Sequence, residues 1–123
     1  MNTDLGYLNC GNNLLASLDV TVNHALTSLH CDSNQLASLD VSTKTALRYL
    51  GCGNNQLASL DVSNNTALIE IDISAMASLY EVCVWEMPSP PEGVSVFTEG
   101  SPNVYFTTIA CSLFPILIRK ILQ

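Results

Sequence analysis

Leucine and other apolar residues recur along this chain at a fixed spacing, with polar residues filling the positions between them. Residues 26–46 and 47–67 carry the same pattern 21 residues apart, and residues 5–25 carry it once more. A fixed period of about twenty residues is typical of a solenoid, because one coil cannot bury its apolar side alone and must stack on its neighbours. The pattern therefore predicts a stack of coils over residues 2–88.

Each 21-residue unit divides into two halves that place apolar residues at positions 1, 4 and 6. The first half reads LxxLxCxxNx and the second reads LxxLDVxxNxx. In an extended strand, positions 4 and 6 point to one side, so we expect them to face the interior while positions 3 and 5 face solvent. No window of useful length has the helical period. The expected fold is a β-rich solenoid of about four coils, with two short parallel strands in each coil and little helix.

An asparagine stands at position 9 of most halves, where the chain must bend. Its side chain tolerates left-handed backbone and bonds nearby main-chain groups, which predicts a tight turn. Lys44 and Met76 take its place in two halves, and we expect looser bends there. After Leu68 the period slips, so that residues 68–78 and 79–88 read as two halves of the second type, back to back.

The pattern changes again near the C-terminal end. A Pro- and Gly-rich run follows residue 88 and predicts loop with short strands at Val94–Thr98 and Val104–Thr108. We assign residues 2–88 to the solenoid, 89–110 to a C-terminal cap and 111–123 to an apolar tail, which either folds back on the cap or is a readthrough extension. The chain opens on a repeat boundary, so we expect a fragment of a larger protein; end-to-end pairing of an uncapped first coil is the alternative.

The LxxLxCxxNxL spacing resembles leucine-rich repeats. The alternation of LxxLxC with LxxLDVS is similar to the 21-residue repeats of surface and secreted proteins of Bacteroidetes-type bacteria, and it covers about residues 2–88. Residues 81–108 also look like the closing piece of such proteins. The resemblance implies a solenoid fold, an extracellular or cell-surface location, and binding of protein or glycan ligands rather than catalysis.

Charge is spread unevenly over the chain. The formal net charge is −7, but residues 1–110 hold all 11 acids and only the bases Lys44 and Arg48, which gives that part −9. An acidic body argues against nucleic acid or an anionic membrane as a partner. The start of the chain lacks the basic and apolar regions of a signal peptide. The longest apolar run, Ile109–Ile118, is interrupted and shorter than the roughly 20 residues of a membrane span.

Three of the five cysteines repeat with the coils. Cys10, Cys31 and Cys52 occupy the inward position 6, which predicts a ladder of buried thiols rather than a metal site or disulfides, because in-register strands hold their side chains parallel. Cys83 falls at an outward position and Cys111 follows the last expected strand. Five cysteines cannot all pair, and three buried thiols plus one disulfide between Cys83 and Cys111, tying the cap to its returning strand, are consistent with this count.

The polar residues give little sign of catalysis. His30 and Cys31 are neighbours in a strand and point to opposite sides, and no nucleophile motif accompanies the Ser, His and Asp residues. We expect no enzyme activity and no cofactor. A column of outward carboxylates is either solvated and bonded to nearby hydroxyl and backbone groups or a weak calcium site; its members are Asp19, Asp40 and Asp61.

The outward positions of the first halves vary from coil to coil, as a recognition surface requires. Aromatic residues, His and Arg are enriched where proteins contact partners. The candidate ligand-binding residues are Tyr7, Asn9, Ser28, His30, Arg48 and Tyr49. We therefore expect a binding module that recognises a protein, or a glycan, through this strand face. A structural spacer without a ligand of its own is the alternative.

Overall fold

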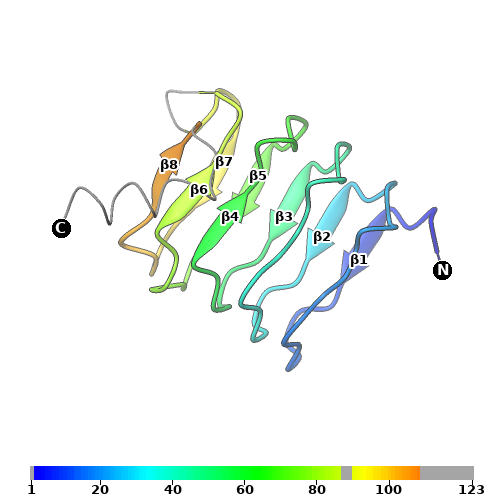
Figure 1. Cartoon of the computed structure of the whole chain (residues 1–123), viewed down its shortest axis with the longest axis horizontal. Helices are drawn as coiled ribbons and strands as arrows, with labels where there is room; N and C mark the ends of the chain where they lie inside the picture. The colour runs from blue at the N-terminus through cyan, green and yellow to red at the C-terminus, as the bar shows by residue number, and fades with distance from the viewer. Residues whose placement is uncertain (1, 87–89, 109–123) are drawn as a thin grey trace.

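The computed structural model describes residues 2–86 and 90–108, which wind into a row of stacked coils (Figure 1). Each strand in this part of the chain is three residues long, because the backbone bends again as soon as the inward position has passed. The strands are β1 (Tyr7–Asn9), β2 (Ser28–His30), β3 (Tyr49–Gly51), β4 (Ser59–Asp61), β5 (Glu70–Asp72), β6 (Glu81–Cys83), β7 (Ser95–Phe97) and β8 (Tyr105–Thr107).

The strands form two parallel sheets that enclose the core. Sheet A has the order β1-β2-β3-β5-β7, and sheet B has the order β4-β6-β8 (Figure 1). All pairs are parallel and in register, so equivalent positions of successive coils form straight columns. The predicted fold class is confirmed: this is a leucine-rich-repeat solenoid with two stacked ladders and no helix among the described residues.

Aliphatic side chains from both sheets fill the interior. Leu29, Leu50 and Ile71 of sheet A and Leu60 and Val82 of sheet B are each no more than 2% exposed. Burying one such side chain contributes about 1.5–3 kcal/mol. That contribution is realised only when a neighbouring coil covers the side chain, so the stacking of coils and the formation of the core are one event.

The cysteine column lies beside this aliphatic column. Cys31 and Cys52 are 0% exposed, and Cys10, in the first coil, is half-buried. All three thiols are free, and Ile73 takes the equivalent place in the fourth coil. The position therefore holds small or branched apolar side chains in a continuous interior column.

Buried asparagine side chains bind each coil to the one before it. Asn55 Nδ2 donates to the carbonyls of Cys31 and Cys52, both at 3.0 Å, and Asn55 Oδ1 accepts from Leu36 N–H at 3.0 Å. Asn34 makes the equivalent bonds one coil earlier. Buried main-chain groups at a bend have no ladder partner, and leaving one unpaired costs about 1–3 kcal/mol. The asparagine removes that cost in two coils at once.

The left-handed residue of these bends is the one before position 9, so the asparagine of position 9 contributes to the tight turn through its side-chain bonds and not through left-handed backbone. Asn12, Ser33 and Asn54 have φ angles of 57°, 58° and 53°, and Ala75 has 54° in the fourth coil. Serine and alanine adopt this conformation at a cost of about 1–2 kcal/mol, whereas asparagine visits it routinely. The asparagine of position 9 is reserved for the buried hydrogen bonds.

The two bends without asparagine are as tight as the others, contrary to our expectation of looser bends. Lys44 N–H donates to Val41 O at 2.9 Å, and Leu47 N–H donates to Lys44 O at 3.1 Å, the same distances as around Asn65. The Met76 carbonyl closes its bend at 3.1 Å as well. The side chains of Lys44 and Met76 are 0% and 1% exposed. Their aliphatic parts therefore fill the space that the asparagine side chain occupies in the other bends.

The slipped period after Leu68 does not disturb the alternation of sheets. Although both halves read alike in the sequence, β5 pairs with β3 in sheet A and β6 pairs with β4 in sheet B. β7 and β8 then extend the two sheets, so sheet A has five rungs where about four coils were expected. The strands expected at 94–98 and 104–108 are therefore part of the stack.

Sheet B begins only in the third coil, so the expectation of two strands per coil holds from there on. A hollow of about 220 Å³ separates the second halves of the first two coils. Side-chain hydrogen bonds join the coils on this side instead. Lys44 Nζ donates to Thr21 O at 3.3 Å, and Asn65 Nδ2 donates to Val41 O at 2.9 Å.

The asparagine bonds between coils give a direct test of stability. Asn55→Ala removes a buried amide and leaves Cys52 O and the Leu36 N–H group without the partner it provided, while Cys31 O keeps its bond from Asn34. We expect a loss of about 2–4 kcal/mol in the free energy of unfolding. Asn13 holds the same position in the first coil, but its side-chain bonds to the described residues stay within its own turn, to Cys10 O and Gly11 O. Asn13→Ala should cost much less. Urea unfolding of both variants measures the difference, and equal losses would contradict a cross-coil role.

Candidate ligand-binding face

The outward side chains of sheet A form two columns that cross all five strands, and together they are called face A. One column consists of Tyr7, Ser28, Tyr49, Glu70 and Ser95. The other consists of Asn9, His30, Gly51, Asp72 and Phe97. Because neighbouring strands lie about 4.8 Å apart, the face extends roughly 19 Å from β1 to β7.

Five of the six predicted ligand-binding residues lie on face A. Tyr7 and Tyr49 are 58% and 38% exposed. Asn9 is exposed and His30 is half-buried. Arg48 is exposed but comes directly before β3, outside the two columns. The structure thus brings the predicted residues together on one side of one sheet, apart from Arg48 at its margin.

Ser28 differs from the expectation of an exposed strand residue, because it is only 9% exposed. It lies between Tyr7 and Tyr49 in the register. The Ser28 Oγ and His30 Nε2 atoms are hydrogen-bonded at 2.9 Å, and the rings of Tyr7 and His30 are 5.6 Å apart with an interplanar angle of 46°. These contacts orient the imidazole. A serine–histidine pair lacks the buried carboxylate that orients the histidine of a catalytic triad, and Asp32 makes no hydrogen bond to His30.

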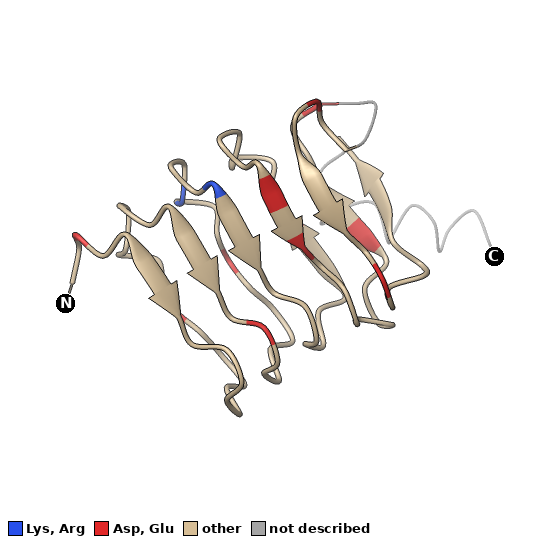
Figure 2. Cartoon of the chain, turned by 180° about the vertical axis from the view of Figure 1, so that it is seen from behind, with Lys and Arg blue, Asp and Glu red and all other residues tan. Residues whose placement is uncertain are grey.

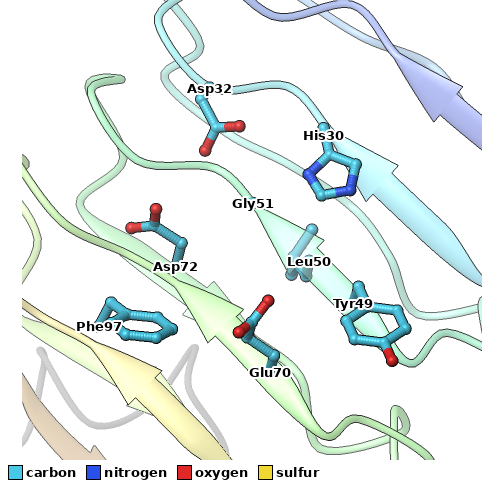
Figure 3. Close-up of a pocket in the computed structure, with 8 residues that line it drawn as sticks. All are labelled: His30, Asp32, Tyr49, Leu50, Gly51, Glu70, Asp72 and Phe97. Carbon is cyan, nitrogen blue, oxygen red and sulfur yellow. The ribbon is translucent and has the colours of Figure 1, made fainter.

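A hollow of about 110 Å³ opens in face A above Gly51 (Figure 3). Several residues around it were not among the sequence candidates: Asp32, Gly51, Glu70, Asp72 and Phe97. Glu70 and Asp72 stand at outward positions 3 and 5 of a half that the sequence assigns to the second type. Their presence on face A follows from the sheet alternation, which was the available signal for finding them.

Acidic side chains give this face its charge. Seen from the side of sheet A, acidic positions lie along β5 and beyond the end of β2, and a basic position precedes β3 (Figure 2). No ion pair joins Asp32, Glu70 or Asp72 to any Lys, Arg or His of the described residues. The face therefore carries negative charge that is not paired with a basic side chain of the described residues.

The ladder thiols are unsuited to chemistry. Burial raises the pKa of the Cys31 thiol to about 12, and burial raises that of Cys52 well above its usual value. Burial also raises the pKa of Cys10. Because the thiolate is the nucleophile and the metal ligand, these groups stay protonated and inert. The Cys31 thiol donates instead to Gly51 O at 3.4 Å.

The aspartate column on the sheet B side serves the turns. Asp19 Oδ1 accepts from the N–H and hydroxyl of Thr21 at 2.9 and 2.6 Å, and Asp40 Oδ1 accepts from Ser42 in the same way. The hydroxyl bond lowers the pKa of both carboxyls. Asp61 bonds Ser63 at 2.9 and 2.5 Å. Among the described residues, no three His, Cys, Asp or Glu side chains converge as a metal ion needs, so the structure adds no support for calcium here.

The proposed disulfide stays a prediction. Cys83 lies in β6 at the outward position that the sequence gave it, and it is only 2% exposed. Cys111 and the apolar tail 111–123 lie outside the described residues.

Glu81 precedes Cys83 by two residues and shares its side of sheet B. Its side chain is 0% exposed, and neither carboxylate oxygen has a hydrogen-bond partner in the described structure. Burial, with a smaller contribution from Asp61, raises the pKa of this carboxyl above its usual 4.5. An uncompensated buried carboxylate is costly when it is charged. The Glu81 carboxylate therefore destabilises sheet B at neutral pH.

Comparison with known proteins relates the chain to one class. No protein-family model matches it, and no curated protein does. Its structure is similar to the functional domain of InlJ from Listeria monocytogenes, which includes a cysteine ladder, with a TM-score of 0.66 and 26% sequence identity. The match covers 83% of this chain and 26% of that one, so the chain spans about a quarter of that domain's length. This chain is a repeat protein with a leucine-rich-repeat solenoid.

The described part of the chain contains no helix that could cross a membrane.

The buried carboxylate of Glu81 predicts how stability depends on pH. Its pKa is higher in the folded state than in the unfolded chain, so its contribution is complete below about pH 4.5 and is lost as pH rises through the raised folded value. Glu81→Gln removes this dependence while keeping the shape of the side chain. We expect the variant to gain stability over the wild type as pH rises from about 4.5 to 7.

Thermal or urea unfolding across that pH range measures the difference. Glu86→Gln makes the same chemical change at an exposed position and is the matched control. A constant difference between wild type and Glu81→Gln at every pH would contradict the assignment.

Proposed function

We propose that this chain is a non-enzymatic binding module that recognises a protein ligand through face A. The observation that carries the proposal is a set of exposed aromatic side chains on a rigid sheet. Tyr7, Tyr49 and Phe97 are 58%, 38% and 51% exposed, on the first, third and fifth strands of sheet A. Aromatic residues supply much of the binding energy of protein interfaces.

The scaffold under these side chains supports the same function. Each strand of sheet A is bonded to its neighbours, and the asparagine bonds between coils fix the bends at its end. A face that is already ordered loses little conformational entropy on binding, and this favours affinity. The outward residues differ from coil to coil while the inward residues repeat, which separates recognition from folding.

The size of face A favours a protein ligand over a glycan. Its exposed aromatics are spread over roughly 19 Å, whereas a sugar ring stacks on one aromatic side chain at a time. Acidic residues between the aromatics favour a ligand surface with positive charge. A glycan ligand is the second candidate, because aromatic rings and carboxylates together also suit sugars.

The proposed setting is the outside of a cell, either on the surface or secreted. The repeat resemblance supports this location, and so does the fold shared with the InlJ domain. In the same setting, a rigid spacer that holds other domains apart is the competing role. The spacer requires the solenoid but gives no reason for exposed aromatic side chains on face A.

A comparison of captured proteins distinguishes these roles. We expect the immobilised wild-type chain to retain at least one specific protein from a cell-surface extract, and the Tyr7→Ala/Tyr49→Ala double variant to bind it about tenfold less tightly or worse. Leu14→Ala is the matched control, since Leu14 is 80% exposed and lies in a bend outside face A. The control should bind as the wild type does.

Two outcomes would count against the proposal. Retention of the same proteins by all three chains would place the contact elsewhere, and the absence of any specific protein would favour the spacer. Binding that disappears when the captured protein is deglycosylated would shift the proposal to a glycan. Unfolding midpoints of the two variants serve as the check that both remain folded.

A further inference from the structure

The hollow in face A lies next to Gly51, a position without a side chain. Gly51 is buried, and the side chains of the neighbouring strands converge over it (Figure 3). A Cβ atom built there would lie 2.9 Å from both carboxylate oxygens of Asp32 and 3.2 Å from His30 Nδ1. The Asp32 carboxylate and the His30 imidazole therefore lie directly over Gly51, where they leave no room for a side chain, and both groups border the hollow.

Three carboxylates line this cavity, and much of their hydrogen-bonding capacity is unused. Asp32 Oδ1 accepts from Gly53 N–H at 3.2 Å, and Asp72 Oδ1 accepts from the N–H and hydroxyl of Ser74 at 3.0 and 2.6 Å. The Oδ2 atoms of both residues and the carboxylate of Glu70 form no hydrogen bond with the described residues. These oxygens are free to accept bonds from a ligand that carries several N–H donors.

Aromatic rings flank the acidic floor. Tyr49 lies on one side of Glu70 and Phe97 lies on the other (Figure 3). A cation over the face of an aromatic ring gains about 0.5–1 kcal/mol at an exposed site. Carboxylates with adjacent rings are complementary to a planar cation that can stack and donate in the same place.

The arrangement is less suited to other ligands of positive charge. No three acidic, histidine or cysteine side chains of the described residues could hold a metal ion, so the carboxylates do not converge on one point. They surround a cavity of about 110 Å³ from several strands instead. A guanidinium group matches this spread, because its five N–H donors point outward in one plane. Two of these donors can bond the two oxygens of one carboxylate, and the others can bond a second carboxylate.

We propose that the Gly51 hollow is a specificity pocket that receives an arginine side chain of the protein partner. The inference rests on the proposed function, since it names the chemistry by which face A would choose its ligand. Arginine would enter between Tyr49 and Phe97, and its guanidinium would bond Asp32, Glu70 and Asp72. Tyr7, the exposed aromatic residue of face A outside the hollow, would then add contact area.

The test uses N-acetyl-arginine amide as the probe and ¹⁵N-labelled protein at low salt. We expect millimolar binding that shifts the amide signals of Gly51 and Asp72 and weakens as salt is added. N-acetyl-citrulline amide has nearly the same shape without the charge and should not bind. N-acetyl-lysine amide should bind more weakly, because a point charge cannot pair with carboxylates in a fork.

A matched pair of variants locates the site. Glu70→Gln removes one charge from the hollow and should lower the affinity for the arginine probe about threefold. Glu92→Gln makes the same change at an exposed position that does not line the hollow, and should leave the affinity almost unchanged. Equal effects of the two variants, binding of citrulline as tight as that of arginine, or unshifted signals around Gly51 would overturn the proposal. Lysine binding as tight as arginine binding would overturn the choice of guanidinium.

The outcomes also distinguish the two proposals. Capture of a protein through Tyr7 and Tyr49 without any binding of the arginine probe would leave the proposed function standing and remove the pocket. Binding of the arginine probe at Gly51 without a captured protein would leave the pocket standing as a guanidinium site and remove the proposed protein-binding function.

Discussion

The hydrogen bonds that buried asparagine side chains make between coils are the constraint on which this structure depends. A solenoid of three-residue strands has many bends, and each bend turns main-chain groups into the interior where water cannot reach them. Asn34 and Asn55 satisfy these groups in their own coil and in the preceding coil at once. The leucine columns supply most of the stabilising free energy, but the asparagines decide that coils stack in register.

In-register stacking is also what makes face A useful. Because every coil adds its outward positions to the same two columns, residues far apart in the chain become neighbours. His30 and Phe97 border the same hollow although 66 residues separate them in the sequence. The inward positions meet the requirements of folding, and the outward positions are left to vary. A single glycine, Gly51, then leaves room for the Asp32 and His30 side chains to lie over the strand, where they border the hollow.

Much of the fold could be predicted from the sequence, because a 21-residue repeat constrains every coil in the same way. The period and the inward positions follow from the spacing of Leu26, Leu29 and Cys31 and their recurrences. The sequence pattern deviates at bends where a residue other than asparagine occupies position 9. Lys44 fills an asparagine position with its aliphatic stem. Ser101 stands at the asparagine position of the fifth coil, where it accepts from Met76 N–H at 2.9 Å and donates to Ile73 O at 2.6 Å. Such substitutions break the pattern without breaking the geometry.

The candidate site was less predictable. Tyr7, His30 and Tyr49 stand at outward positions of clear repeats, so spacing alone places them together. Glu70 and Asp72 belong to residues 68–78, whose sequence resembles the second half of a repeat rather than the first. Only the pairing of β5 with β3 assigns them to sheet A. The hollow is bordered by a glycine, Gly51, and by Phe97 of the cap strand β7. Neither leaves a periodic signal, because a cavity is a property of several coils together.

Native-state hydrogen exchange of the Leu36 amide is the most direct test of the central claim. This N–H group donates to Asn55 Oδ1 of the next coil and belongs to no strand ladder. If cross-coil asparagine bonds hold the stack, the Leu36 amide will exchange about a thousandfold slower than an exposed amide, at the rate of the core strand amides. Exchange of Leu36 as fast as that of an exposed bend residue such as Thr66 would contradict the account.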